Sequence, residues 1–408
     1  MSIHIFKIPT KHQFYSMFKP LFRRLCLLIL LGILFSSLAY AIVYETGLQN
    51  VTQTIVRKWL SGWDKRVKIT IDHNDVSSDL TNFPILIYIG DSSGQNNDNV
   101  TFIFNELVSD GNRKKIAVTT SDKTTQCYVE IEKWDTSNKQ AWLWVKVPNI
   151  SSTADTDLYL YYDKNQTDNT NYVGDIGSTP AQNVWDSSYK GVYHLQGDPA
   201  TPTSNKDSTS NQNDPTFNGS MTLEDQVAGE IDGSIDFDGT DDFVSVPDNE
   251  SLQFTNSLTI EAWIKLNSSG SGSDVDIILR KGEENPNDYQ LAVNDQKLAL
   301  TIEENDGGGL NSSASLSTMT WYYVAGTWDG TTRKVYIDGL ENASDSKSGS
   351  IVPDNRTIYV GGRLGADLSY GIIDEVRASS ISRNEAWIKA SYESGRDHLL
   401  DFGTEETA

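Results

Sequence analysis

The chain has 408 residues, of which 38% are hydrophobic, so it is long enough for two domains and too apolar to be globally disordered. Its formal net charge is −23 at pH 7. A surface this acidic repels phosphate backbones, which argues against nucleic acid as a partner.

The N-terminus has the pattern of an export segment. Basic residues precede an uncharged run over residues 25–43, and Ala39-Tyr40-Ala41 is a small–x–small sequence of the kind that signal peptidases recognise. The run is also long enough to span a bilayer. Residues 1–41 are therefore a cleaved signal peptide or an uncleaved single-helix anchor, the only expected contact with a membrane. We expect residues 42–62 to be a linker and the protein to be secreted or held at the cell surface.

Short segments rich in β-branched and aromatic residues follow, separated by Asn, Asp, Gly and Ser. They cover residues 67–71, 83–89, 101–104, 115–120, 127–134, 141–147 and 157–162. Their spacing predicts an antiparallel β-sandwich of unknown function over residues 63–180. Trp142, Trp144 and Lys146 share one face of their strand, and this face is either covered by a second layer or free as a binding platform.

A polar stretch rich in Asn, Asp and Gly, over residues 163–181, places a domain boundary near residue 180. Strand-like segments then resume at residues 191–195, 234–237, 243–246, 258–266, 276–281, 289–293, 297–302, 321–328, 333–337, 357–361 and 371–376. Asp329-Gly330 is a two-residue hairpin signal, and Asp338-Gly339 is a second turn. These features predict an all-β second domain.

One helix is expected near the C-terminus. Ser382 and Glu385 have the spacing of a capping box, and Gly395 follows at the distance expected for a helix end.

Six sequence blocks of the second half resemble a laminin-G-like, concanavalin A-like jelly roll, assigned here to residues 181–405. The blocks are WDSSYKGVYHL (185–195), IDFDGTDDFVSVP (235–247), LTIEAWIKL (258–266), WYYVAGTWDGTTRKVYIDG (321–339), IYVGGR (358–363) and GIIDEVRAS (371–379). The first half resembles an extracytoplasmic domain family of unknown function, the one numbered 2341, on FPILIYI (83–89), YVEIEKWD (128–135) and AWLWVKVPNISSTADTDLYLYYDKN (141–165). The fold expectation is two antiparallel β domains after the N-terminal hydrophobic segment.

The stretch IDFDGTDDFVSV, residues 235–246, places Asp236, Asp238, Asp241 and Asp242 within seven positions. Such a cluster has three possible interpretations: a metal site, a pair of catalytic carboxylates or an acidic β-turn. We interpret it as a turn joining two strands, because Gly239 supplies a permissive backbone and aspartates at turns accept amide hydrogen bonds.

Glucanases of the concanavalin A-like class need two carboxylates about 5–5.5 Å apart for a retaining mechanism, which on one strand requires a Glu-x-Asp-x-x-Glu run. The nearest approach is Glu230-Ile231-Asp232, where Ile235 stands at the position of the last Glu. Glu130 and Glu132 share a face but lie in the other domain. We therefore expect a protein that is not an enzyme, with a carbohydrate-active enzyme as the remote alternative.

The resemblance also implies a structural Ca²⁺ between an early loop and the last strand of the jelly roll. Asp207 and Asn213, from the loop, and Asp374 are the corresponding candidate ligands, with oxygen donors that suit Ca²⁺. Ser210 stands where the family prefers Gly, so the loop departs from the family pattern at a position where Gly would allow a positive φ.

Jelly rolls bind sugars by stacking aromatic rings on pyranose faces and by hydrogen bonds to hydroxyls. Trp263, Tyr289, Arg363 and Tyr370 are the weak candidates for carbohydrate binding. The expected function is recognition or adhesion outside the cytoplasm, with a glycan or glycoprotein as ligand. The alternative is a structural spacer or protein adhesin without sugar binding.

Overall fold

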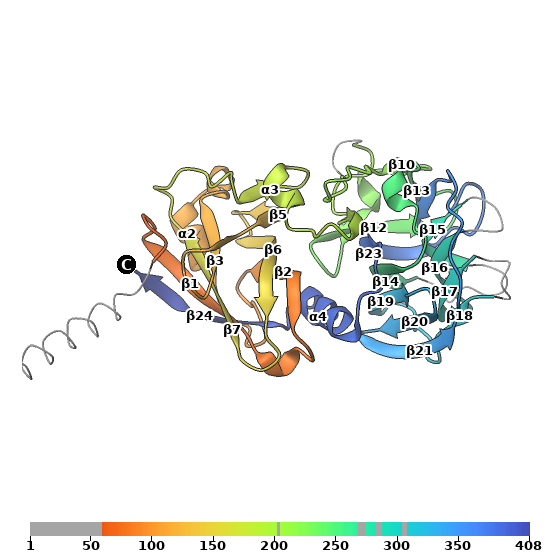
Figure 1. Cartoon of the computed structure of the whole chain (residues 1–408). Helices are drawn as coiled ribbons and strands as arrows, with labels where there is room; N and C mark the ends of the chain where they lie inside the picture. Colours follow the sequence, from red (N-terminus) through yellow and green to blue (C-terminus); the bar gives the residue numbers. More distant parts are fainter. Residues whose placement is uncertain (1–58, 202–204, 268–274, 283–287, 304–307) are drawn as a thin grey trace, which may run out of the picture. The chain divides into compact units, whose positions relative to one another are not determined.

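The computed structural model describes residues 59–201, 205–267, 275–282, 288–303 and 308–408 (Figure 1). The predicted signal or anchor over residues 1–41, and most of the predicted linker, lie outside these residues. Within the part of the chain that the structure describes, no helix has the length and hydropathy needed to cross a membrane.

The first β domain is a sandwich of two sheets. One sheet has the strand order β24-β1-β7-β3-β4, and the other has the order β2-β6-β5-β8. The strands are β1 (Lys65–Ile71), β2 (Leu80–Ile89), β3 (Ile116–Thr120), β4 (Gln126–Cys127), β5 (Val129–Asp135), β6 (Gln140–Ile150), β7 (Thr156–Tyr162), β8 (Val173–Asp175) and β24 (Leu400–Thr407). All pairings are antiparallel except β5 with β8. The predicted antiparallel sandwich is present, with this one parallel pair.

The predicted strand over residues 101–104 is wrong. This segment begins the helix α2 (Phe102–Leu107), which buries Ile103, Phe104 and Leu107 against the core. A four-residue apolar run carries no clear period, so its sequence does not distinguish a strand from one buried turn of helix.

The last strand crosses the predicted domain boundary. The jelly roll was expected to extend to residue 405, but β24 pairs antiparallel with β1 at the edge of the first domain's sheet (Figure 1). Leu400 and Phe402 are buried in that domain's core, and Arg66 forms an ion pair with Glu406 at 2.6 Å. Residues 400–407 lie in the first domain because β24 forms hydrogen bonds to an open sheet edge there and buries these side chains.

The second β domain consists of two larger sheets. Their orders are β10-β13-β22-β15-β16-β17-β18 and β11-β12-β23-β14-β19-β20-β21, and β9 pairs with β23. The strands are β9 (Tyr189–Tyr193), β10 (Thr216–Asn218), β11 (Gln226–Ala228), β12 (Gly233–Asp238), β13 (Phe243–Val246), β14 (Leu258–Leu266), β15 (Val275–Lys281), β16 (Tyr289–Asn294), β17 (Lys297–Ile302), β18 (Leu310–Asn311), β19 (Trp321–Trp328), β20 (Thr332–Ile337), β21 (Leu340–Ser346), β22 (Ile358–Val360) and β23 (Tyr370–Ser379). Alternate residues of each sheet meet in one apolar core, as in a jelly roll.

Local turn signals place most connections correctly. Asp338-Gly339 is a two-residue turn between β20 and β21, with φ of 50° and 76°. The β19–β20 hairpin at Asp329-Gly330 is present, but its loop has four residues because Trp328 pairs with Arg333.

Two helices flank the jelly-roll sequence. The first is the short α3 (Thr179–Gln182) at the predicted boundary. The second, α4 (Glu385–Gly395), ends at Gly395 as expected, but the predicted capping box at its start is wrong. Asn384 is the N-cap, and its side chain accepts a hydrogen bond from the Trp387 amide at 2.9 Å.

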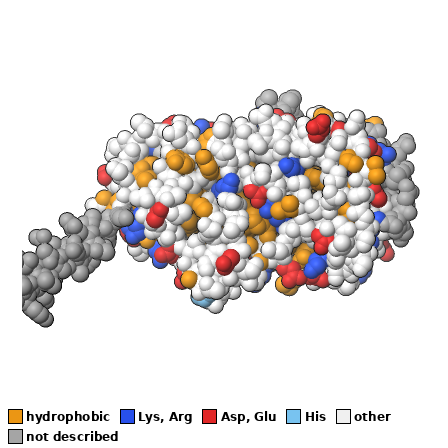
Figure 2. All heavy atoms as spheres, in the orientation of Figure 1, with side chains coloured by type: hydrophobic (Ala, Val, Ile, Leu, Met, Phe, Trp, Pro, Cys, Tyr) orange, Lys and Arg blue, Asp and Glu red, His pale blue; other side chains and the backbone are white. Residues whose placement is uncertain are grey.

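The two β domains share a packed surface. The face of β6 that carries Trp142, Trp144 and Lys146 is covered by a second layer, because Trp144 contacts Trp185 with ring centroids 5.5 Å apart. The Lys146 ammonium donates to the carbonyl of Asn183 at 3.0 Å. One hydrophobic cluster therefore continues from the first domain into β9, β14, β19 and α4. On the face drawn in Figure 2, acidic, basic and apolar side chains are intermixed.

Candidate functional site

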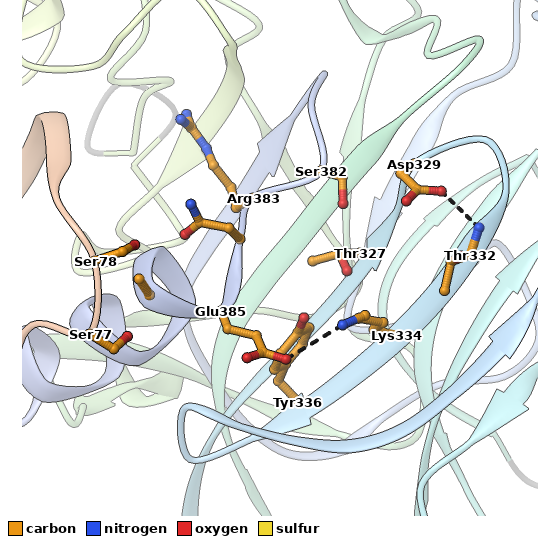
Figure 3. Close-up of a pocket in the computed structure, with 12 residues that line it drawn as sticks. Ser77, Ser78, Thr327, Asp329, Thr332, Lys334, Tyr336, Ser382, Arg383 and Glu385 are labelled. Atoms are coloured by element: carbon orange, nitrogen blue, oxygen red, sulfur yellow. Dashed lines mark hydrogen bonds and ion pairs between the residues drawn. The ribbon is translucent and has the colours of Figure 1, made fainter.

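A pocket of about 600 Å³ lies beside β19 and β20, on the face turned away from the jelly-roll core (Figure 3). Its walls come from three places: the two strands and their hairpin loop, the segment that begins α4, and a loop of the first domain. The lining residues are Ser77, Ser78, Thr327, Asp329, Thr332, Lys334, Tyr336, Ser382, Arg383, Asn384, Glu385 and Ala386. All of these residues except Ala386 carry a hydroxyl, amide or charged group.

Strand alternation presents the residues of β20 to the pocket. Lys334 and Tyr336 point toward it, whereas Val335 between them lies in the jelly-roll core. The Lys334 ammonium donates to Glu341 at 2.6 Å and to Glu385 at 3.4 Å. The hydrogen bond to Glu341, opposed by partial burial, raises the pKa of Lys334. The lysine therefore stays charged at neutral pH.

The start of α4 forms the opposite wall. Arg383 pairs with both carboxylate oxygens of Asp186 at 2.9 and 3.0 Å, and its guanidinium lies 3.9 Å from the centre of the Trp387 ring. Burial alone would raise the pKa of Asp186, but Arg383 outweighs it and lowers the pKa. Glu385 remains largely exposed, so its carboxylate is available to a ligand.

The hairpin loop closes one end of the pocket. One Asp329 carboxylate oxygen accepts hydrogen bonds from the Thr331 and Thr332 amides at 2.8 and 2.7 Å. These bonds lower the pKa of Asp329, together with the Thr331 hydroxyl, which contributes most. The loop is thus held in one conformation by its own side chain.

The structure separates the predicted carbohydrate-binding residues from this pocket. Trp263 is buried and packs edge-on against Tyr323, and Tyr289 is fully buried with its hydroxyl donating to the Leu252 carbonyl. Neither ring can stack on a sugar. Tyr370 is 47% exposed, and Arg363 is half-buried and paired with Asp367 at 2.6 Å, but neither lines the pocket.

Sequence reasoning missed the residues that do line the pocket. Its only signals there were the Asp329-Gly330 turn and the helix start near Ser382, each treated as punctuation of the fold. The β19–β20 hairpin and the start of α4 come together only because of the sheet order, which the sequence pattern does not give.

The acidic stretch at residues 235–246 is a turn, as interpreted. Gly239 has φ of 72°, and one Asp238 oxygen accepts from the Thr240 and Asp241 amides at 2.7 and 3.3 Å. The Asp241 carboxylate accepts a hydrogen bond from the Ser220 hydroxyl of a neighbouring loop, and not from an amide of its own turn. Burial, with Asp238 beside it, raises the pKa of Asp242 to about 6.

Hydrogen bonds join only two of the three candidate calcium ligands. Asp207 accepts from the amides of Val192, Thr209 and Asn213 and from the Thr209 hydroxyl, so Asp207 and Asn213 do lie together. Asp374 accepts from the Ile231 amide at 2.9 Å and shares no hydrogen-bond partner with Asp207. Because N–H and O–H donors already surround Asp207, these residues do not fit a shared Ca²⁺.

The carboxylates considered for catalysis are also away from the pocket. Glu130 and Glu132 are buried where the two β domains meet, and burial raises the pKa of Glu230. None of these three residues lines the 600 Å³ pocket.

Comparisons with solved structures give low similarities. Domain 4 of a GH43 extracellular arabinanase from Geobacillus stearothermophilus, solved with arabinotriose, is 16% identical with a TM-score of 0.40, covering 50% of this chain and 97% of that one. The binding domain of Paraclostridial Mosquitocidal Protein 1 is 17% identical with a TM-score of 0.41, covering 51% and 52%. The binding domain of botulinum neurotoxin serotype G is 13% identical with a TM-score of 0.39, covering 50% of each chain. This chain therefore spans about half the length of the toxin domains.

No curated protein matches the sequence. Two family models do. Residues 238–389 match the concanavalin A-like lectin/glucanases superfamily, and residues 112–179 match the domain of unknown function numbered 2341. The layout expected from the sequence motifs is thus confirmed: a match to the family numbered 2341 precedes a match to the concanavalin A-like lectin/glucanases superfamily.

Proposed function

We propose that this chain is an extracytoplasmic recognition protein that binds a glycan, free or on a glycoprotein, in the polar pocket beside β19 and β20. The observation that carries the proposal is the lining of that pocket. Residues with hydroxyls, one amide, two carboxylates and two cations line a volume of about 600 Å³, within the range of about 300–1,000 Å³ typical of ligand pockets.

The chemistry of the lining favours a ligand with many hydroxyls. Serine, threonine and tyrosine hydroxyls both donate and accept hydrogen bonds, and a carboxylate can accept two from vicinal hydroxyls. Glu385 and Lys334 point toward each other in the pocket and form an ion pair at 3.4 Å (Figure 3). A saccharide can exchange hydrogen bonds with both groups without separating a tightly buried pair.

The proposed location outside the cytoplasm is supported by the N-terminal sequence pattern and the acidic composition. Binding without catalysis is part of the proposal.

A glycan array probed with the full chain, with Ca²⁺ and again with chelator, tests the proposal. We expect selective binding in both buffers. Glu385→Gln should weaken it about tenfold or more, because a hydrogen bond to a charged group contributes about 1.5–3 kcal/mol and 1.4 kcal/mol corresponds to a factor of ten.

Glu341→Gln is the matched control. Glu341 pairs with the same lysine but does not line the pocket, so its removal should leave glycan affinity within about twofold. Equal losses in both variants would mean that the lysine pairing matters and the pocket does not. Binding to no glycan in either buffer contradicts the proposal.

A structural spacer is the second candidate, and one observation favours it. Seven of the ten tryptophans are buried, so few large aromatic faces remain for sugar stacking. A chain that binds no glycan but keeps a fixed distance between the ends of residues 59–408 under load would support this alternative.

A further inference from the structure

A buried cluster lies where the two β domains meet, separate from the polar pocket. Glu132 is on β5 of the first domain, His194 follows β9, and Glu375 is on β23. The side chains of all three are at most 2% exposed, and one ligand-capable atom from each lies within 4.8 Å of the other two. Each domain thus contributes side chains to one cluster of an imidazole and two carboxylates, which are common metal ligands.

The imidazole of His194 has a defined orientation in this cluster. Its Nδ1 lies 2.5 Å from Oε1 of Glu375 and 3.5 Å from Oε2 of Glu132. Its Nε2 lies 3.5 Å from Oε2 of Glu130 and makes no hydrogen bond. Nδ1 therefore faces the two carboxylates, and Nε2–H would face the third.

Hydrogen-bond donors hold the carboxylates from outside. The indole of Trp144 donates to Glu132 at 2.6 Å, and that of Trp185 donates to Glu130 at 2.6 Å. Arg377 donates to Oε2 of Glu375, leaving its Oε1 toward the histidine. In protein metal sites, surrounding groups commonly hold the ligands by hydrogen bonds, and a carboxylate often lies beside the histidine nitrogen that does not bind the metal.

The cluster has an excess of buried negative charge. Glu130, Glu132 and Glu375 each lie within 3.5 Å of His194, and Glu375 also pairs with Arg377, while nearby Asp232 pairs separately with Lys133. One oxygen each of Glu130, Glu132 and Asp374 has no hydrogen bond. Uncompensated buried carboxylates are costly unless they are neutralised by protons or by a cation.

We propose that Glu132, His194 and Glu375 bind one divalent transition-metal ion, with Zn²⁺ as the first probe. An imidazole nitrogen with two carboxylates is a ligand set that Zn²⁺ accepts, whereas Ca²⁺ prefers oxygen donors alone. Nδ1 of His194 would bind the ion, and the proton it shares with Glu375 would leave to solvent. Because the ligands come from both β domains, the ion would fix one domain to the other.

Two further features fit this assignment. Glu375 has φ of 54° at an irregularity in the pairing of β23 with β14, so Asp374, Glu375 and Arg377 all avoid the jelly-roll core. Glu132 also borders a second pocket of about 330 Å³, although its carboxylate is itself buried.

The test is made on the full chain, unfolded in guanidinium chloride with chelator and then refolded with or without Zn²⁺. After desalting, metal content is measured by mass spectrometry and the unfolding temperature by calorimetry. We expect about one bound ion and a higher unfolding temperature. Refolding with Co²⁺ should give the visible absorption bands of a site with nitrogen and oxygen ligands.

His194→Gln should lose the ion, and His73→Gln is its matched control. His73, with Asp72 and Asp155, forms an exposed group of the same composition, also within 4.8 Å. Loss of metal in His73→Gln but not in His194→Gln overturns the proposal. So does a wild-type chain that refolds without binding Zn²⁺ or Co²⁺ and gains stability only on acidification, since protons would then neutralise the cluster. The wild-type measurements decide the matter even where His194→Gln fails to fold.

Discussion

Asp397 shows how a single side chain sets a pH dependence. It follows α4 with φ of 55°, a conformation that Asp and Asn tolerate better than most residues. One carboxylate oxygen accepts from the Gly94 amide at 2.8 Å, and the other is buried without a hydrogen bond. Burial, only partly opposed by the Gly94 amide, raises the pKa of Asp397 to about 7. A carboxylate at a helix C-terminus is also unfavourable toward the helix dipole.

We predict that Asp397→Asn stabilises the protein at pH 8 by about 1–3 kcal/mol and has little effect at pH 4. An unfolded Asp titrates near pH 3.9, so the folded state holds this proton more tightly. The stability of the wild type therefore falls as the pH rises from about 4 to about 7, and the variant lacks this loss. Urea unfolding at several pH values measures the difference. Exposed Asp91→Asn is the control, and a pH-independent gain would contradict the explanation.

At the scale of elements, β24 shows how a strand distant in sequence completes a sheet. It pairs with β1 from Lys65↔Thr407 to Ile71↔Leu400. The Tyr162 hydroxyl also donates to Glu405 at 3.0 Å. Phe402 is the strand's large buried side chain, at 8% exposure. The strand covers an edge that would otherwise offer unpaired backbone groups to other chains.

We predict that Phe402→Ala lowers the free energy of unfolding by about 3 kcal/mol, because it removes a buried aromatic ring and leaves a cavity. Thr404→Ala, on an exposed position of the same strand, should change it by less than about 0.5 kcal/mol. Urea unfolding of both variants provides the comparison. Similar effects of the two substitutions would show that the strand is not packed on the core.

At the scale of the whole molecule, residues 59–408 form a single unit although they contain two β domains. The hydrophobic cluster of the first domain includes Trp185, Trp263 and Trp387 from beyond the predicted boundary. Together with β24, this shared cluster makes each domain depend on the other for its burial.

We therefore predict that residues 59–180 alone do not fold to a stable monomer. Adding a peptide of residues 397–408 should partly restore structure, since an added strand can complete an open edge. Near-ultraviolet circular dichroism and light scattering with and without the peptide make the test. A scrambled peptide is the control. A fragment that folds fully by itself would show that the two domains are independent.

The sequence by itself determined the fold class, the domain order and most strands, because alternation of apolar residues and turn chemistry act over a few residues. It also identified the turn at Asp238–Asp242 correctly. Trp263 was a candidate for sugar stacking because it lies on the polar face of its strand, and Tyr289 because it lies near a loop, but neither position states what covers the ring. Their burial was decided by Tyr323, Tyr392 and the loop before β14, all remote in sequence.

Only the tertiary structure decided where β24 pairs, which residues line the polar pocket and which charges meet at Glu132, His194 and Glu375. These contacts join positions separated by tens to hundreds of residues. They depend on sheet order and on the packing of one domain against the other, which local periodicity does not encode. The physical reason is that a sequence pattern states which face of an element must be buried, whereas only the assembled fold supplies the partner that buries it.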